Sequence, residues 1–120
     1  SGLMEEHPEL KIQLFHGGGH LPYQIGRLDR AYEMRLETSK KISMKPSEYL
    51  KMFYFDTIVH SGEALEYLIN LVGAEQVMLG SDYPFDMGSY KLVDMVDKIN
   101  FNEEDKKKIK SENAERLFQV

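Results

Sequence analysis

The stretch LKIQLFHGGGHLPYQIGR, residues 10–27, contains the signals of a strand, a glycine loop and the start of a helix. Residues 10–15 are rich in apolar side chains and end at glycines, a pattern that predicts a strand buried on at least one face. Three consecutive glycines indicate a sharp turn or a close approach of the backbone to another group. Beyond Pro22 the apolar residues recur at intervals of three and four, which predicts an amphipathic helix with Ile25, Leu28, Tyr32 and Leu36 on one side.

The alternation of strand and helix continues along the chain. Residues 53–60, FYFDTIVH, combine aromatic and β-branched side chains and predict a second strand. Ser61 is a suitable N-cap for the helix that follows, and Gly73 is expected to end it. A third strand is predicted over residues 76–80. Strands that alternate with helices form parallel sheets through right-handed crossovers, so we predict an α/β fold with three parallel strands.

The remaining segments are assigned by the same rules. Residues 37–46 show no periodicity and predict a loop, after which Pro46 opens a short helix. Residues 81–88 predict a second loop. The helix after that loop is expected from Leu92, Val93, Val96 and Ile99. Asn102 is expected to cap a last helix whose inner side carries Ile109, Ala114, Leu117 and Phe118.

Length and composition restrict the class of protein. A chain of 120 residues is the size of one ordinary domain, so residues 1–120 are expected to form a single unit. The net charge of −5, without a long basic face, argues against nucleic acid and anionic membranes as partners. The chain has no cysteine, so histidine and carboxylate are the strong metal-binding side chains it offers. The lack of cysteine and of a long apolar run suits a protein of the cytoplasm.

Polar residues follow each of the three predicted strands, within residues 16–20, 56–60 and 81–86. The loops that leave the carboxyl ends of parallel strands gather at one edge of a sheet, where active sites are found in barrels and open sheets alike. We therefore expect these three clusters to form an active site.

Within the clusters, His16 and Asp82 are the strongest candidates. His16 lies directly at a strand end, glycines leave room beside it, and imidazole suits proton transfer at neutral pH. Asp82 is interpreted either as a metal ligand or general base, or as the cap of a loop. Arg27 either lies on a solvated helix surface or reaches a carboxylate over the strand ends.

Three further polar residues have weaker signals. His20 is expected to cap the helix after the glycine loop. Asp56 and His60 either cap the entry to the next helix or support the site from behind. A simple metal-binding module made of His16, His20, His60 and Asp82 is a further alternative.

Four segments resemble a known family: KIQLFHGGGHLPYQIGR, YLKMFYFDTIVH, VMLGSDYPFDMG and the NAERLF of the last helix. They are similar to the C-terminal part of the amidohydrolase-related, metal-dependent decarboxylases. The resemblance implies a portion of a (β/α)8 TIM-type barrel, roughly its strands six to eight with their helices.

The same resemblance implies roles for individual residues. His16 corresponds to the catalytic histidine that passes protons between an activated water and the substrate, and Asp82 to a ligand of a divalent metal, zinc or manganese. Arg27 and Phe85 correspond to substrate-binding residues, with Arg27 acting in a neighbouring subunit. The family's other ligands, a His-x-His pair and a further histidine, have no counterpart here, so the ligand set is incomplete in this chain.

The function expected from the resemblance is non-oxidative decarboxylation of a small unsaturated or aromatic carboxylic acid. A metal-dependent hydrolase or hydratase of the same superfamily is the first alternative. The second is a catalytically inactive chain that acts only by self-association. An open edge on a three-stranded parallel sheet favours association, so a homo-oligomer is expected in each case.

Overall fold

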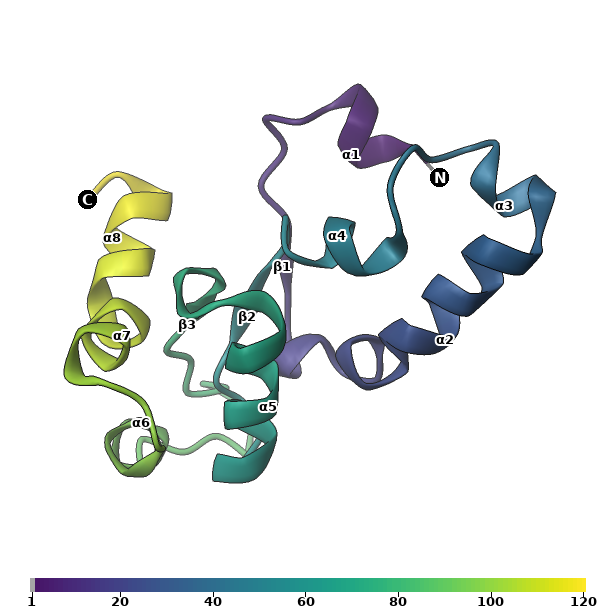
Figure 1. Cartoon of the computed structure of the whole chain (residues 1–120). Coiled ribbons are helices and arrows are strands. Elements are labelled where there is room, and N and C mark those ends of the chain that lie inside the picture. Colours follow the sequence, from purple (N-terminus) through teal and green to yellow (C-terminus); the bar gives the residue numbers. More distant parts are fainter. Residues whose placement is uncertain (1) are drawn as a thin grey trace.

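The structure, a computed structural model, describes residues 2–120 and the side chains of all of these except Thr38 and Ser39. Three parallel strands form its sheet in the order β1-β2-β3 (Figure 1). They are β1 (Gln13–Leu14), β2 (Tyr54–Asp56) and β3 (Val77–Met78). Phe55 lies opposite Leu14 on one side and Val77 on the other. The predicted α/β fold is confirmed, but each strand is shorter than expected because the backbone turns soon after the paired residues.

Six helices precede the last helical segment of the described chain: α1 (Leu3–Glu6), α2 (Leu21–Met34), α3 (Leu36–Ser39), α4 (Pro46–Leu50), α5 (Gly62–Val72) and α6 (Leu92–Lys98). Ser61 caps α5 as predicted, since its hydroxyl accepts a hydrogen bond from the Ala64 N–H at 3.3 Å. Two expectations are wrong. The loop predicted over residues 37–46 begins with the short helix α3. Helix α2 ends at Met34, before the predicted Leu36, because Arg35 has an extended backbone. Among the described residues, no helix combines the length and the apolar character needed to cross a membrane.

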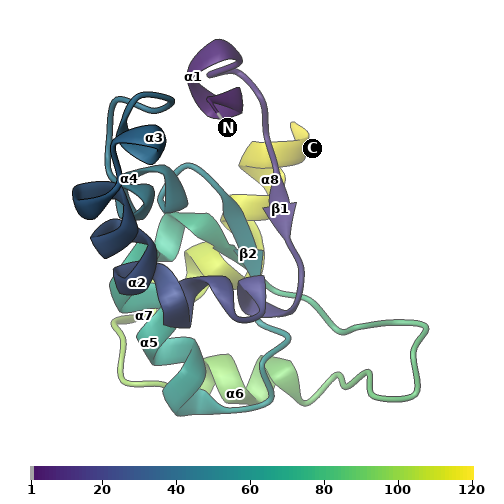
Figure 2. The ribbon, with the colours of Figure 1, turned by 90° about the vertical axis from the view of Figure 1, so that its right-hand side faces the viewer.

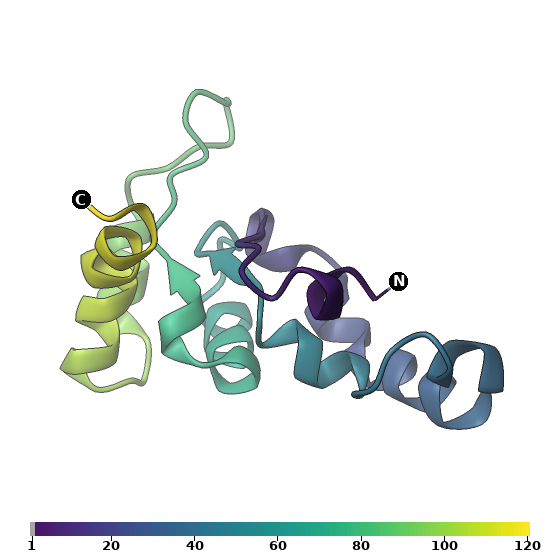
Figure 3. The ribbon, with the colours of Figure 1, turned by 90° about the horizontal axis from the view of Figure 1, so that it is seen from above.

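The core lies between the sheet and the helices on one of its faces. Helices α2, α4 and α5 lie on the same side of the strands, while the loop after β3 projects on the other side (Figures 2 and 3). Phe55 is fully buried at the centre of the sheet. The core cluster around it includes Leu65, Leu68, Val96 and Ile109. The helices therefore cover one face, and the strand ends open toward the other.

A group of hydrogen bonds to Glu5, here called the clasp, holds the N-terminal helix α1 to Ser43 and Tyr49, before and within α4. One carboxylate oxygen of Glu5 accepts hydrogen bonds from the Ser43 N–H at 2.7 Å, the Ser43 hydroxyl at 2.6 Å and the Tyr49 hydroxyl. The hydrogen bonds from Ser43 lower the pKa of Glu5. The clasp joins two segments far apart in the sequence, which no local pattern predicts.

The last helical segment contains a π turn. This segment consists of α7 (Glu103–Lys107), the π turn η3 (Lys108–Glu112) and α8 (Asn113–Phe118). Asn102 caps it as predicted, accepting from the Asp105 N–H at 2.8 Å. The predicted inner position of Phe118 is wrong: this side chain is 63% exposed because it lies in the final turn.

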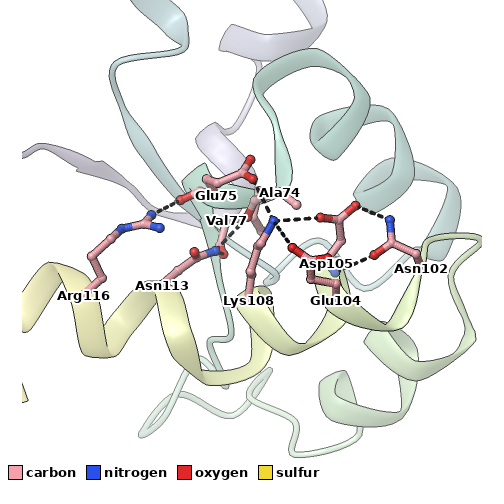
Figure 4. A network of polar contacts seen from close by, with 9 residues as sticks. All are labelled: Ala74, Glu75, Val77, Asn102, Glu104, Asp105, Lys108, Asn113 and Arg116. Atoms are coloured by element: carbon pink, nitrogen blue, oxygen red, sulfur yellow. Dashed lines mark hydrogen bonds and ion pairs between the residues drawn. The ribbon is translucent and has the colours of Figure 1, made fainter.

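The π turn and Asn113 hold the outer edge of β3. The Ile109 carbonyl accepts from the Leu79 N–H at 2.9 Å, and the Asn113 amide donates to the carbonyls of Ala74 at 2.7 Å and Val77 at 2.8 Å (Figure 4). A π turn leaves helical carbonyls without their usual partners, which makes them available to a strand. These bonds satisfy backbone groups on the outer side of β3. Among the described residues neither β1 nor β3 has a further strand beside it, as expected for an open sheet.

Charged groups reinforce this junction. The Lys108 ammonium lies 3.0 Å from Glu75, 3.2 Å from Glu104 and 3.4 Å from Asp105. The hydrogen bond to Glu75 is the main cause that raises the pKa of Lys108. Arg116 donates to the Glu75 carbonyl at 2.7 Å (Figure 4). Two cations of the last helical segment therefore hold the turn that leads into β3.

We predict that Asn113→Ala destabilises the chain by about 2–3 kcal/mol, because it removes the two buried hydrogen bonds that the side-chain amide donates to the carbonyls of Ala74 and Val77. The control is Asn70→Ala on the exposed side of α5, which is expected to change the free energy of unfolding by less than about 0.5 kcal/mol. Urea denaturation of the two variants measures the difference. Equal midpoints would show that Asn113 does not anchor β3.

Candidate active site at the strand ends

The ends of the three strands meet at one groove. His16 follows β1, Asp56 is the last residue of β2, and Asp82 lies a few residues after β3. All three line a groove of about 380 Å³, together with Phe15, Tyr83 and Phe85. The predicted convergence of polar residues at one sheet edge is therefore present in the structure.

The glycine loop forms a tight turn in the left-handed region. His16 has φ 56°, Gly17 φ 58° and Gly18 φ 80°. Glycine tolerates such values freely, whereas histidine does so only where surrounding contacts hold it. A Cβ on Gly17 would lie 2.4 Å from Val59, and one on Gly18 would lie 2.8 Å from the Phe55 ring. The glycines are needed because the turn is packed directly onto β2 and the residues after it.

Asp56 supplies the contacts that hold this turn. Its side chain is buried, and one carboxylate oxygen accepts from the His16 N–H at 3.0 Å. The other oxygen accepts from the N–H groups of Gly17 at 2.9 Å and Ile58 at 3.0 Å. Asp56 therefore caps a turn from another strand and does not cap helix α5. Of its two predicted roles, support from behind the site agrees with the geometry.

His16 and Asp82 are brought together from different strands. The His16 Nε2 atom lies 3.4 Å from a carboxylate oxygen of Asp82. The His16 side chain is 63% exposed and faces the groove, while that of Asp82 is 12% exposed. A covered carboxylate beside an accessible imidazole is an arrangement that serves proton transfer or metal binding.

Asp82 begins a loop that projects from the body of the molecule (Figures 2 and 3). The loop is closed at its base, where the Ser89 N–H donates to the Ser81 carbonyl at 2.8 Å. The Phe85 N–H donates to the Asp82 carbonyl at 2.9 Å. Phe85 lines the groove and is 69% exposed, so it offers an apolar wall to a ligand.

Arg27 and His20 lie apart from this pair, whereas His60 lines a second pocket together with it. Arg27 lies on the exposed side of α2, in a separate shallow groove with Arg30 and Arg35, and does not line the groove of His16. His20 occupies the N-cap position of α2, but its side chain makes no capping hydrogen bond there. His60 lines a second pocket of about 390 Å³, which also contains His16, Asp82 and Met87. The four residues of the alternative metal-binding module do not converge.

The described residues do not by themselves form a metal site. Among residues 2–120, no group of three or more histidine, aspartate or glutamate side chains converges on a point that an ion could occupy. Asp82 has the chemistry of a ligand for a divalent cation, since carboxylate oxygens bind zinc, magnesium and manganese. The residues present fit one position of such a site and leave the others to groups outside this segment.

Comparison with known proteins agrees with this geometry. The sequence matches the family described as Amidohydrolase over residues 1–120. The chain belongs to the amidohydrolase family. Its parallel strands and helices are part of the TIM-type barrel of these proteins, as predicted.

Relatives of this amidohydrolase chain are decarboxylases. The 2-amino-3-carboxymuconate-6-semialdehyde decarboxylase of Dictyostelium discoideum is 36% identical over 115 residues, which are 94% of this chain and 32% of that protein. The structure of 5-carboxyvanillate decarboxylase from Sphingomonas paucimobilis is 34% identical, with a TM-score of 0.88 over 100% of this chain and 37% of its own.

A second solved structure was determined with a metal. The dihydroxybenzoic acid decarboxylase from a Polaromonas species, with bound manganese and the inhibitor 2-nitroresorcinol, is 31% identical. Its TM-score is 0.84, over 99% of this chain and 36% of its own. This amidohydrolase chain spans about a third of the length of the curated relatives it matches.

Two glycines of this amidohydrolase chain offer a matched test of the turn. We predict that Gly17→Ala destabilises the chain by more than about 2 kcal/mol, because the added methyl group meets Val59 and the backbone is left-handed. Gly26→Ala places a methyl group in open space on α2. It is expected to stabilise the helix by about 0.5–1 kcal/mol. Thermal denaturation measures both, and equal melting temperatures would contradict the close packing of the turn.

Proposed function

We propose that this chain supplies the proton-transfer group and one metal ligand of a metal-dependent decarboxylase. The observation that carries the proposal is the pair of His16 and Asp82, 3.4 Å apart in one groove and delivered by different strands. The relatives described above are named as decarboxylases, which favours decarboxylation over hydrolysis or hydration. The activity belongs to the longer protein whose C-terminal part we propose this chain to be, with residues 1–120 as one unit.

Asp82 would hold the metal in this proposal. The manganese in the Polaromonas relative supports a divalent ion, zinc or manganese, as the cofactor. When bound, the ion acts as a Lewis acid that draws electron density from substrate oxygen atoms. The remaining ligands come from outside residues 2–120.

His16 would move the proton. Decarboxylation breaks the bond between a carbon and its carboxyl group, carbon dioxide leaves, and the electron pair stays on the carbon. That carbon must then accept a proton, which the protonated imidazole of His16 delivers from its exposed position in the groove.

The walls of the groove support the proposed substrate class. Phe85, Tyr83 and Phe15 line it with exposed aromatic rings, which suits a flat aromatic or unsaturated acid. The relatives act on acids of this kind, as the names carboxyvanillate and dihydroxybenzoic acid state. Arg27 lies outside the groove, so a role in substrate binding requires a neighbouring copy of the chain. That role, the homo-oligomer and the cytoplasmic compartment stay predictions.

The test uses the longer protein, with 5-carboxyvanillate, a dihydroxybenzoate and a ring-opened amino-carboxymuconate as substrates. His16→Ala is expected to lower carbon dioxide release by about a hundredfold or more at unchanged metal content. Asp82→Asn is expected to lose the metal. The control is His7→Ala, at an exposed histidine outside the groove, which is expected to retain full activity.

Full carbon dioxide release by the His16 variant would refute the proton-transfer role. Turnover of these acids by hydrolysis or hydration, without carbon dioxide, would assign the groove to the alternative reactions of the superfamily.

A further inference from the structure

Asp56 and Thr57 are neighbours at the end of the central strand and are both buried, with 1% and 0% exposed. Asp56 borders the groove but is almost fully covered, as Thr57 is, so neither side chain is accessible to a ligand as a reacting group must be. Each nevertheless uses its side chain to bind backbone from a different neighbouring segment. The two contacts lie on opposite sides of β2, toward the turn after β1 and the segment after β3.

Thr57 binds the segment that leads to Asp82. Its hydroxyl accepts from the Gly80 N–H at 3.2 Å and lies 3.4 Å from the Gly80 carbonyl, to which it donates. Its own N–H donates to the Met78 carbonyl at 3.1 Å. Gly80 is two residues before Asp82, so these bonds fix the start of the loop that carries the carboxylate.

The glycine at this contact allows the close approach. A Cβ on Gly80 would lie 2.9 Å from the Ile58 side chain and 3.3 Å from the Cβ of Asp56. Gly17, on the opposite side, would meet Val59 in the same way. Both glycines therefore lie directly against side chains of residues 56–59, which leave no room for a further Cβ. A displacement of this short stretch would move both segments.

We infer that Asp56 and Thr57 are positioning residues that together set the separation of His16 and Asp82. Asp56 fixes the turn that carries His16, and Thr57 fixes the segment that carries Asp82. The inference deepens the proposed function and rests on it for the catalytic consequence. The geometric consequence does not depend on the proposed function. Asp56 controls the position of His16 and Thr57 that of Asp82, so a substitution of one should displace only its own partner.

Amide hydrogen exchange of this chain tests the geometric consequence. Asp56→Asn replaces one acceptor oxygen by a donor and is expected to speed exchange at His16 and Gly17 by about tenfold, with Gly80 unchanged. Thr57→Val keeps the shape and removes the hydroxyl, and is expected to speed exchange at Gly80 by about fivefold, with His16 unchanged. Thr57→Ser keeps the hydroxyl and is expected to restore the protection. Asp94→Asn, at an exposed aspartate of α6, is the control for the loss of one charge.

Kinetics of the longer protein test the catalytic consequence. Asp56→Asn is expected to lower kcat by about tenfold or more at unchanged manganese affinity, because only the proton donor is displaced. Thr57→Val is expected to weaken manganese binding by about tenfold, as supporting groups of metal ligands do, with kcat recovered at saturating manganese. A merely structural role would change both quantities together in both variants.

The outcomes separate the inference from the proposed function. If each variant speeds exchange at both segments, or at neither, Asp56 and Thr57 do not position the two halves separately and the inference is overturned. If each variant speeds exchange only at its own segment, but the changes in kcat and manganese affinity are not separated between the two variants, the positioning stands. The roles proposed for His16 and Asp82 then fail. If each variant has only its own expected effect in both experiments, the results support the inference and the proposed function together.

Discussion

The buried carboxylate of Asp56 is the contact on which the arrangement of the strand ends depends. It accepts backbone N–H groups from His16 and Gly17, two residues that lie forty positions earlier in the chain. Backbone groups buried without partners are costly, and left-handed backbone at a histidine is strained, so the turn needs an acceptor at this place. Because the acceptor comes from the central strand, the glycine turn is fixed to the middle of the sheet.

The last helical segment contacts the outer side of β3. The Ile109 carbonyl and the Asn113 amide bind backbone groups of β3 and the residue after it. Lys108 and Arg116 hold the turn that precedes the strand. The strand whose end leads to Asp82 is thus held from both sides. Among residues 2–120 neither β1 nor β3 has a partner strand on its outer side, and these are the two places where further strands of a closed barrel would pair.

Local signals in the sequence were sufficient for the order of the three strands and the main helices, and for the convergence of polar residues at the strand ends, but not for the short helices α1 and α3. The Ser61 and Asn102 caps, the β-branched run around Phe55 and the glycines after β1 each depend on near neighbours, and each was predicted. His16 and Asp82 were found because both follow strands. Their separation, by contrast, depends on contacts between segments far apart in the sequence.

Those distant contacts explain what the sequence analysis missed. Thr57 gave no signal, since a threonine after a strand has many ordinary uses, and Asp56 was left between two roles because its partners lie on another strand. The π turn before Asn113 is set by packing against β3, which helical periodicity does not contain. The strands were predicted too long because apolar side chains continue beyond the residues that pair.

The most direct test is a crystal structure of the longer protein with manganese, located by its anomalous scattering. We predict that a carboxylate oxygen of Asp82 lies in the coordination shell of the ion, that His16 faces the same space, and that the Asp56 carboxylate still holds the N–H groups of His16 and Gly17. An ion bound elsewhere, with Asp82 paired only to protein groups or the glycine turn detached from Asp56, would contradict this account of the site.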